Sequence, residues 1–85
     1  LGVVPGAGAS LVDAAAGEGC QVFITGEMKH HEVIAANARG VSIILAGHSN
    51  TERGYLVHLA DRLRPMLAPV DVVTSKADRT LMQTV

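Results

Sequence analysis

Large aromatic side chains are scarce in this 85-residue sequence, which has one Phe, one Tyr and no Trp. A chain of this length hides only about 60–65% of its unfolded surface when it folds. Because the apolar content is carried by Val, Ile, Leu and Ala, a single chain can build only a small core. We therefore expect the chain to be stable only with copies of itself or with a further segment of its own protein.

Basic stripes, disulfides and long apolar runs are also missing. The seven basic and eight acidic residues are scattered, so direct binding of nucleic acid is not expected. The single cysteine, Cys20, excludes an internal disulfide and is expected to be a core thiol. A chain without an internal disulfide fits a reducing compartment, and we expect a cytoplasmic protein. No apolar run approaches the ~20 residues that span a bilayer, so no membrane association is expected.

Four short apolar runs alternate with three stretches of helical character. The strands are predicted at residues 1–5, 20–25, 41–46 and 69–74, and the helices at residues 10–16, 30–39 and 51–67. This order predicts an α/β fold, a βαβαβαβ layer with a parallel-dominated sheet and helices on both faces. Residues 1–85 then form a single α/β unit. Because the chain starts at Leu1 and not at Met, inside a predicted strand, we expect a fragment or a processed form.

The third predicted helix carries a leucine stripe. Its members recur at three- and four-residue steps and are expected to be buried: Leu56, Leu59, Leu63 and Leu67. Glu52 lies one turn before this stripe, so its carboxylate is expected to point toward the upper edge of the sheet. His58 falls away from the stripe and is expected at the surface. Pro65 is expected to kink or stop the helix.

Three loops are predicted to meet at one edge, because every strand of a parallel sheet releases its following loop at the carboxyl end. These loops read "GAGAS" (6–10), "TGEMKHH" (25–31) and "GHSNTE" (47–52). The topology alone therefore brings distant polar groups to a common rim, where ligands bind in open α/β folds.

His48 and Glu52 in the third loop allow two interpretations. An imidazole and a carboxylate four residues apart can reach one ion, and the pairing suits Zn, Fe or Mn. The same stretch also spells a capping box, in which Ser49 caps the helix and Glu52 reaches back to the Ser49 amide. Two ligands are too few for a metal site, so the residues alone favour the cap.

The second loop offers Glu27, His30 and His31. Adjacent helical side chains point about 100° apart, so the two histidines are not expected to chelate one ion together. They are either solvated residues of a helix start, or one of them faces the rim as a proton shuttle or substrate ligand. Glu27 is expected to be a first-turn acid of the following helix, with a catalytic role as the alternative.

The first loop, "GAGAS", is a weak candidate for binding an anion. Gly6, Gly8 and Ser10 open a predicted helix, where glycines allow close approach and free amides favour anions. The loop lacks the third glycine of the dinucleotide motif and the Lys of a P-loop. A tight turn is therefore the stronger interpretation.

Taken together, "PGAGAS", "VFITGEMKHHEV" and "GHSNTERGYL" resemble a known family in their order and spacing. They are similar to the C-terminal part of the NGG-one-interacting factor three-like proteins, often labelled GTP cyclohydrolase I type 2-like. The resemblance covers essentially the whole chain. It implies two related α/β layers around a two-metal site, of which this chain is one part, and assembly into ring-like homo-oligomers.

The resemblance also assigns roles to particular residues. His48 and Glu52 match the family's metal ligands, for two divalent ions such as Zn, Fe or Mn in a complete site. His31 matches a histidine that lines the same cavity and would act as a catalytic proton carrier or substrate anchor. The family's remaining ligands, a His pair and an Asp, belong to an N-terminal half that this sequence does not contain. The adjacent histidines at 30–31 are not that pair.

Two functions from different classes follow from the resemblance. One is a metal-dependent hydrolase that acts on a small substrate, such as a nucleotide or another phosphorylated compound. The other is a non-catalytic, metal-stabilised scaffold that binds regulatory protein partners. No aromatic residue at the predicted rim selects a purine. Bound metal without turnover would distinguish the scaffold from the enzyme.

Overall fold

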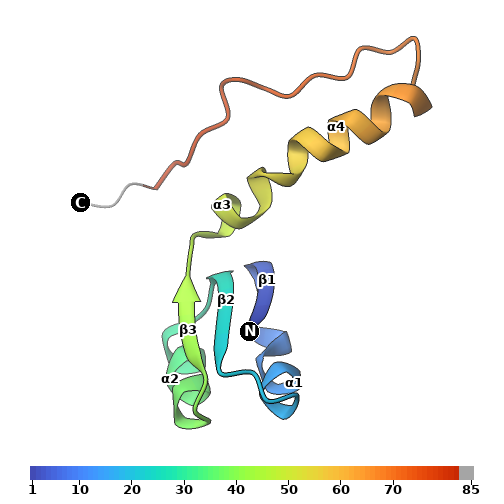
Figure 1. The fold of residues 1–85 in the computed structure, drawn as a ribbon. Coiled ribbons are helices and arrows are strands. Elements are labelled where there is room, and N and C mark those ends of the chain that lie inside the picture. Colours follow the sequence, from blue (N-terminus) through green and yellow to red (C-terminus); the bar gives the residue numbers. More distant parts are fainter. Residues whose placement is uncertain (83–85) are drawn as a thin grey trace.

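The computed structural model describes residues 1–82 and contains a three-stranded parallel sheet (Figure 1). Its strands are β1 (Gly2–Ala7), β2 (Val22–Glu27) and β3 (Ser42–Leu45), and they lie side by side in the order β1-β2-β3. Both neighbouring pairs are parallel, and Ile24 of β2 is in register with Val3 on one side and Ile44 on the other. The predicted α/β class with a parallel sheet is confirmed.

Helical segments follow each strand. A short 3-10 turn, η1 (Ala9–Leu11), leads into α1 (Val12–Gly17), and α2 (His30–Ala38) follows β2. After β3 come α3 (His48–Arg53) and α4 (Tyr55–Met66). No helix among residues 1–82 is long and apolar enough to cross a membrane.

The core lies on one face of the sheet. Phe23, only 1% exposed, packs with Val12 of α1 and with Ala36 at the end of α2. Cys20 is half-buried against the same cluster, as expected for a core thiol. Since the strands progress in one direction and parallel crossovers share one hand, α1 and α2 belong on the same face.

The opposite face differs from the expectation that helices cover both faces. Its central row consists of Val3, Ile24 and Ile44, one residue from each strand. Val3 is 65% exposed and Ile44 is 49% exposed. Within residues 1–82, this apolar row therefore lacks the helical cover that α1 and α2 give the other face.

The predicted fourth strand, residues 69–74, is wrong. This segment has no regular secondary structure and returns along α4, away from the sheet (Figure 1). A strand needs a neighbour that exchanges backbone hydrogen bonds. Here the Val72 carbonyl instead accepts a hydrogen bond from the Arg64 side chain, at 3.3 Å. The apolar residues of the segment do not mark burial within the described residues either, since Val70 and Val73 are 64% and 82% exposed.

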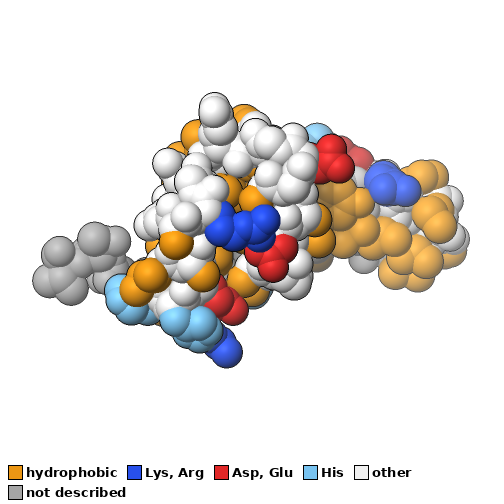
Figure 2. Space-filling view, turned by 90° about the horizontal axis from the view of Figure 1, so that it is seen from below, with side chains coloured by type: hydrophobic (Ala, Val, Ile, Leu, Met, Phe, Trp, Pro, Cys, Tyr) orange, Lys and Arg blue, Asp and Glu red, His pale blue; other side chains and the backbone are white. Residues whose placement is uncertain are grey.

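The third predicted helix is divided at Gly54 into α3 and α4. As expected, α4 ends next to Pro65, at Met66. It points away from the sheet, and hydrophobic side chains gather at its far end, on the right in Figure 2. The predicted leucine stripe is incompletely covered, because Leu56 and Leu59 remain 39% and 37% exposed. His58 is exposed, as expected.

The shape of the molecule reflects this projecting helix. Its radius of gyration is 16.5 Å, whereas a compact domain of this length has one of about 12 Å. The difference arises because α4 and residues 67–82 form an arm beside the sheet and its two helices (Figure 1).

Candidate functional site

The site lies at the carboxyl edge of the sheet, where α3 packs against the ends of β1 and β2. The approach is so close that only glycine fits at Gly26. A Cβ atom there would lie 2.5 Å from the Gly6 carbonyl oxygen and 2.7 Å from the Cα of His48. Gly47, with φ of 91°, turns the chain from β3 into α3. The glycines therefore bring His48 directly onto the strand ends.

Two threonine hydroxyls fix the loop after β1. Thr25 is fully buried, and its hydroxyl accepts a hydrogen bond from the Gly8 amide at 2.9 Å and donates one to the Gly6 carbonyl at 3.2 Å. The Thr51 hydroxyl accepts from the Gly6 amide at 2.8 Å and donates to the His48 carbonyl at 2.7 Å. Thr51 thus ties β1 to the first turn of α3.

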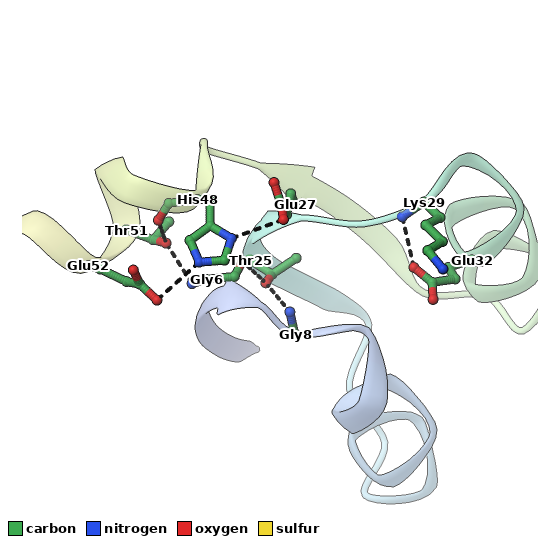
Figure 3. Close-up of polar contacts among 9 residues, drawn as sticks. All are labelled: Gly6, Gly8, Thr25, Glu27, Lys29, Glu32, His48, Thr51 and Glu52. Atoms are coloured by element: carbon green, nitrogen blue, oxygen red, sulfur yellow. Dashed lines mark hydrogen bonds and ion pairs between the residues drawn. The ribbon is translucent and has the colours of Figure 1, made fainter. Parts of the chain in front are cut away.

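His48 lies between two carboxylates (Figure 3). Its Nδ1 is 3.0 Å from Oε1 of Glu27, the last residue of β2. Its Nε2 is 3.4 Å from Oε1 of Glu52, one turn further along α3. The two carboxylates therefore meet opposite edges of the imidazole ring.

This arrangement changes the acidity of His48. The hydrogen bond to Glu27 raises the pKa of His48 above its ordinary value, partial desolvation opposes the rise, and the negative charge of Glu52 adds to it. All three side chains remain partly exposed to solvent. The site is therefore a rim cluster and not a buried ion pair.

The capping-box interpretation of "SNTE" is wrong. Helix α3 begins at His48 with Gly47 as its N-cap, and no side chain caps it. The Glu52 carboxylate faces the His48 imidazole instead of turning back to the Ser49 amide. The local pattern was correct for a helix start, but the helix starts two residues too early for Ser49 to cap it.

The expectation for Glu27 is also wrong. Glu27 ends β2, and α2 begins only at His30. The acid in the first turn of α2 is Glu32, whose Oε2 accepts a hydrogen bond from the Lys29 amide at 2.8 Å. Sequence analysis missed the pairing of Glu27 with His48. The signal was available, because a strand that continues through Gly26 places Glu27 at the rim.

His31 and His30 lie exposed in the first turn of α2. They follow β2, so they belong to the same edge of the sheet as Gly6 and His48, as the topology predicts. Among residues 1–82, no hydrogen bond or ion pair joins His31 to His48. A catalytic role for His31 stays a prediction.

The anion site at Gly6, Gly8 and Ser10 also stays a prediction. The amides of Gly6 and Gly8 already donate to Thr51 and Thr25. These contacts favour the alternative of a tight turn, because an anion would have to displace the hydroxyls. Ser10 is exposed in the short turn η1.

The donors His48 and Glu52 fit one side of a metal site. Two ligand atoms at roughly 2.1 Å from a tetrahedral ion lie about 3.4 Å apart, which matches the distance between Nε2 and Oε1. Gly6 keeps the space beside them open, since a Cβ there would lie 2.6 Å from Glu52 Oε1. In the described part of the chain, no group of three or more such donors is assembled. A metal ion held by these two donors would need further ligands from elsewhere.

Comparison with known proteins places these residues in a family context. The model of the Duf34/NIF3 family (NGG1p interacting factor 3) matches residues 1–80. The human NIF3-like protein 1 is 38% identical over 81 residues, 94% of this chain and 21% of that protein. The bovine NIF3-like protein 1 is 41% identical over 75 residues, 87% of this chain and 19% of that protein.

Two bacterial proteins extend the comparison. The GTP cyclohydrolase 1 type 2 homolog of Haemophilus influenzae is 40% identical over 53 residues, 62% of this chain and 21% of that protein. The crystal structure of a Bacillus cereus protein related to NIF3 shares the fold, with a TM-score of 0.75 at 23% identity over 98% of this chain and 24% of that one. The chain spans about a fifth of the length of the curated relatives it matches. The chain belongs to the Duf34/NIF3 family.

Proposed function

We propose that this chain contributes one part of a two-metal hydrolase site, in which His48 and Glu52 are ligands. The observation that carries the proposal is the 3.4 Å separation of His48 Nε2 and Glu52 Oε1 beside Gly6. The similarity to a protein named GTP cyclohydrolase 1 type 2 homolog supports a hydrolytic reaction. The remaining ligands come from outside the described residues.

The side chains of this chain have separate tasks in such a site. Divalent ions, when bound, supply a water molecule of lowered pKa that can attack at neutral pH. His48 and Glu52 hold the metal side of the site. His31, on the same edge, carries a proton or anchors the substrate.

The space beside His48 suits a small substrate. A cavity of about 340 Å³ extends from Gly47 and His48 to Arg53, within the range of small-molecule sites. Arg53 already pairs with Asp78 at 2.7 Å. We propose a nucleotide or another phosphorylated compound as the substrate class. The basis is the relative's name, since the charge of Arg53 is already paired.

A scaffold that binds regulatory proteins is the second candidate. The apolar row of Val3, Ile24 and Ile44 favours it, because its two outer members are exposed and contiguous exposed apolar surface marks contact sites. A similar yeast protein is named NGG1-interacting factor 3. A ring-like homo-oligomer would use such a surface as well.

The proposal is tested on the whole protein that contains this chain. Glu52→Gln keeps the size of the side chain but removes the charge that binds a divalent ion, so bound metal and activity should fall together. His48→Ala should lose metal as well. Glu32→Gln is the matched control, because Gln can also complete the cap at Lys29. Elemental analysis measures the metal, and full occupancy in Glu52→Gln would contradict the proposal.

A second measurement separates the two candidates. The metal-loaded protein is assayed for hydrolysis of a panel of nucleotides and phosphoesters. Turnover that disappears in Glu52→Gln supports the hydrolase. Bound metal with no turnover of any compound in the panel supports the scaffold.

A further inference from the structure

We infer that Glu27 is a positioning residue that orients His48 and fixes which ring nitrogen is offered to the metal. The inference rests on the proposed function of His48 as a ligand. It is carried by a contact of the site itself, the 3.0 Å distance between Glu27 Oε1 and His48 Nδ1 (Figure 3).

The contact favours one tautomer of the imidazole. A neutral ring carries a single N–H and an ionised carboxylate can only accept it, so the shorter contact, 3.0 Å to Glu27 against 3.4 Å to Glu52, favours the proton on Nδ1. The lone pair then lies on Nε2, the nitrogen that faces Glu52. Metal-bound histidines commonly donate their other ring N–H to a carboxylate, which sets the ring orientation and increases the basicity of the ligand. Glu27 is placed to do this for His48.

The backbone holds Glu27 in position from both sides. Glu27 pairs with Ala7 in the ladder between β1 and β2. On the other side, the Gly47 amide donates to the carbonyl of the preceding residue, Gly26, at 2.9 Å. Glu27 therefore reaches His48 from the end of a strand with paired neighbours, although more than half of its side chain is exposed.

A direct role of Glu27 as a ligand beside Glu52 does not match this geometry. Figure 3 shows the two carboxylates on opposite sides of the His48 ring. Glu27 Oε1 contacts Nδ1, whereas Glu52 Oε1 faces Nε2. An ion held by Nε2 and Glu52 therefore lies across the ring from Glu27.

The experiment compares Glu27→Ala and Glu27→Gln with Glu32→Gln as a control, all in the whole protein. Zinc affinity is measured by competition with a chromophoric chelator. The His48 tautomer is measured by ¹⁵N NMR of the metal-free protein, at a pH where the imidazole is neutral. Glu27→Ala should weaken zinc binding about 10- to 100-fold and reduce the population with the proton on Nδ1. Glu27→Gln should lose less, because its amide oxygen still accepts the N–H.

Two results would overturn the inference. One is wild-type zinc affinity and an unchanged tautomer in Glu27→Ala. The other is an equal loss in Glu27→Gln and Glu52→Gln, which would make Glu27 a ligand. If elemental analysis finds no Zn, Fe or Mn in the wild-type protein, the proposed function of His48 fails, and the tautomer measurement still decides whether Glu27 orients the ring.

Discussion

Residues 1–53 and residues 54–82 differ in how they are held. The first region has a core around Phe23 and a site whose backbone is held by threonine hydroxyls and close glycine contacts. In the second region, α4 and the segment after it extend from the sheet and leave large apolar side chains exposed. Within α4, only Ala60 is buried.

The comparison shows which part of the chain can define a site by itself. His48, Glu27 and Glu52 are positioned by strand ends and the first helical turns, all within the first region. The leucine stripe of α4 has helical periodicity but no matching surface along most of its length among residues 1–82. An amphipathic helix gains its stability from burying such a face. The second region is therefore expected to need a partner.

The largest effect is predicted for the chain studied without such a partner. The 85-residue chain by itself should not be a cooperatively folded monomer at low micromolar concentration, because its buried core is small and α4 is uncovered. Sedimentation and urea unfolding measure this against the whole protein. A folded monomer with a sharp unfolding transition would contradict the prediction and the comparison of the two regions.

Adding one methyl group at a glycine in each region tests the difference in packing between the two regions. Gly26→Ala, in the whole protein, places a Cβ within 3 Å of Gly6, His48 and Thr51. It should cost about 3 kcal/mol in the free energy of unfolding and loosen the proposed metal site.

Gly54→Ala is the matched control, because no atom lies within 4 Å of its added Cβ and its φ of −60° is helical. It should be neutral or stabilise by up to about 1 kcal/mol. Denaturant unfolding measures both variants. Equal effects would contradict the packing difference.

Thr51 gives a smaller effect within the first region. Thr51→Val keeps the shape of the side chain but leaves the Gly6 amide and the His48 carbonyl without their hydroxyl partner. The loss should be about 1–3 kcal/mol in unfolding free energy. Thr51→Ser retains the hydroxyl and should lose clearly less. A valine variant as stable as the serine variant would show that these hydrogen bonds contribute nothing measurable.

Sequence analysis predicted the first region better than the second. The three strands were recognisable because each is a continuous apolar run between turn residues. The fourth run, residues 69–74, has the same composition, but composition records a tendency to be buried and not the presence of a strand edge. Division of the last helix at Gly54 was also missed, because the leucine spacing continues through α4 without a break.

The candidate site was predicted in part for a similar reason. Topology placed the loops containing Gly6, His31 and His48 at one edge, and the structure confirms that edge. Glu27 was placed on the wrong element, because the end of β2 could not be distinguished from the start of α2 by composition. The hydrogen bond between Gly6 and Thr51 joins residues 45 positions apart, and no local pattern contains that information.

The smallest predicted effect concerns the protonation of His48 in the metal-free protein. The hydrogen bond to Glu27 raises the pKa of His48, and Glu52 adds to the rise. Because the folded-state pKa lies above the unfolded value, the stabilisation is fully present below the unfolded pKa. It is lost as the pH rises through the folded-state pKa. The side chains are partly exposed, so the change in stability should be slight and should weaken further with salt.

NMR titration of the imidazole with a chelator present should give a pKa above the ordinary value, and Glu27→Gln should lower it. A wild-type pKa at or below the ordinary value would mean that the two carboxylates do not hold the ring in solution. The first region would then lack an ordered site, and this part of the comparison with the uncovered second region would be wrong.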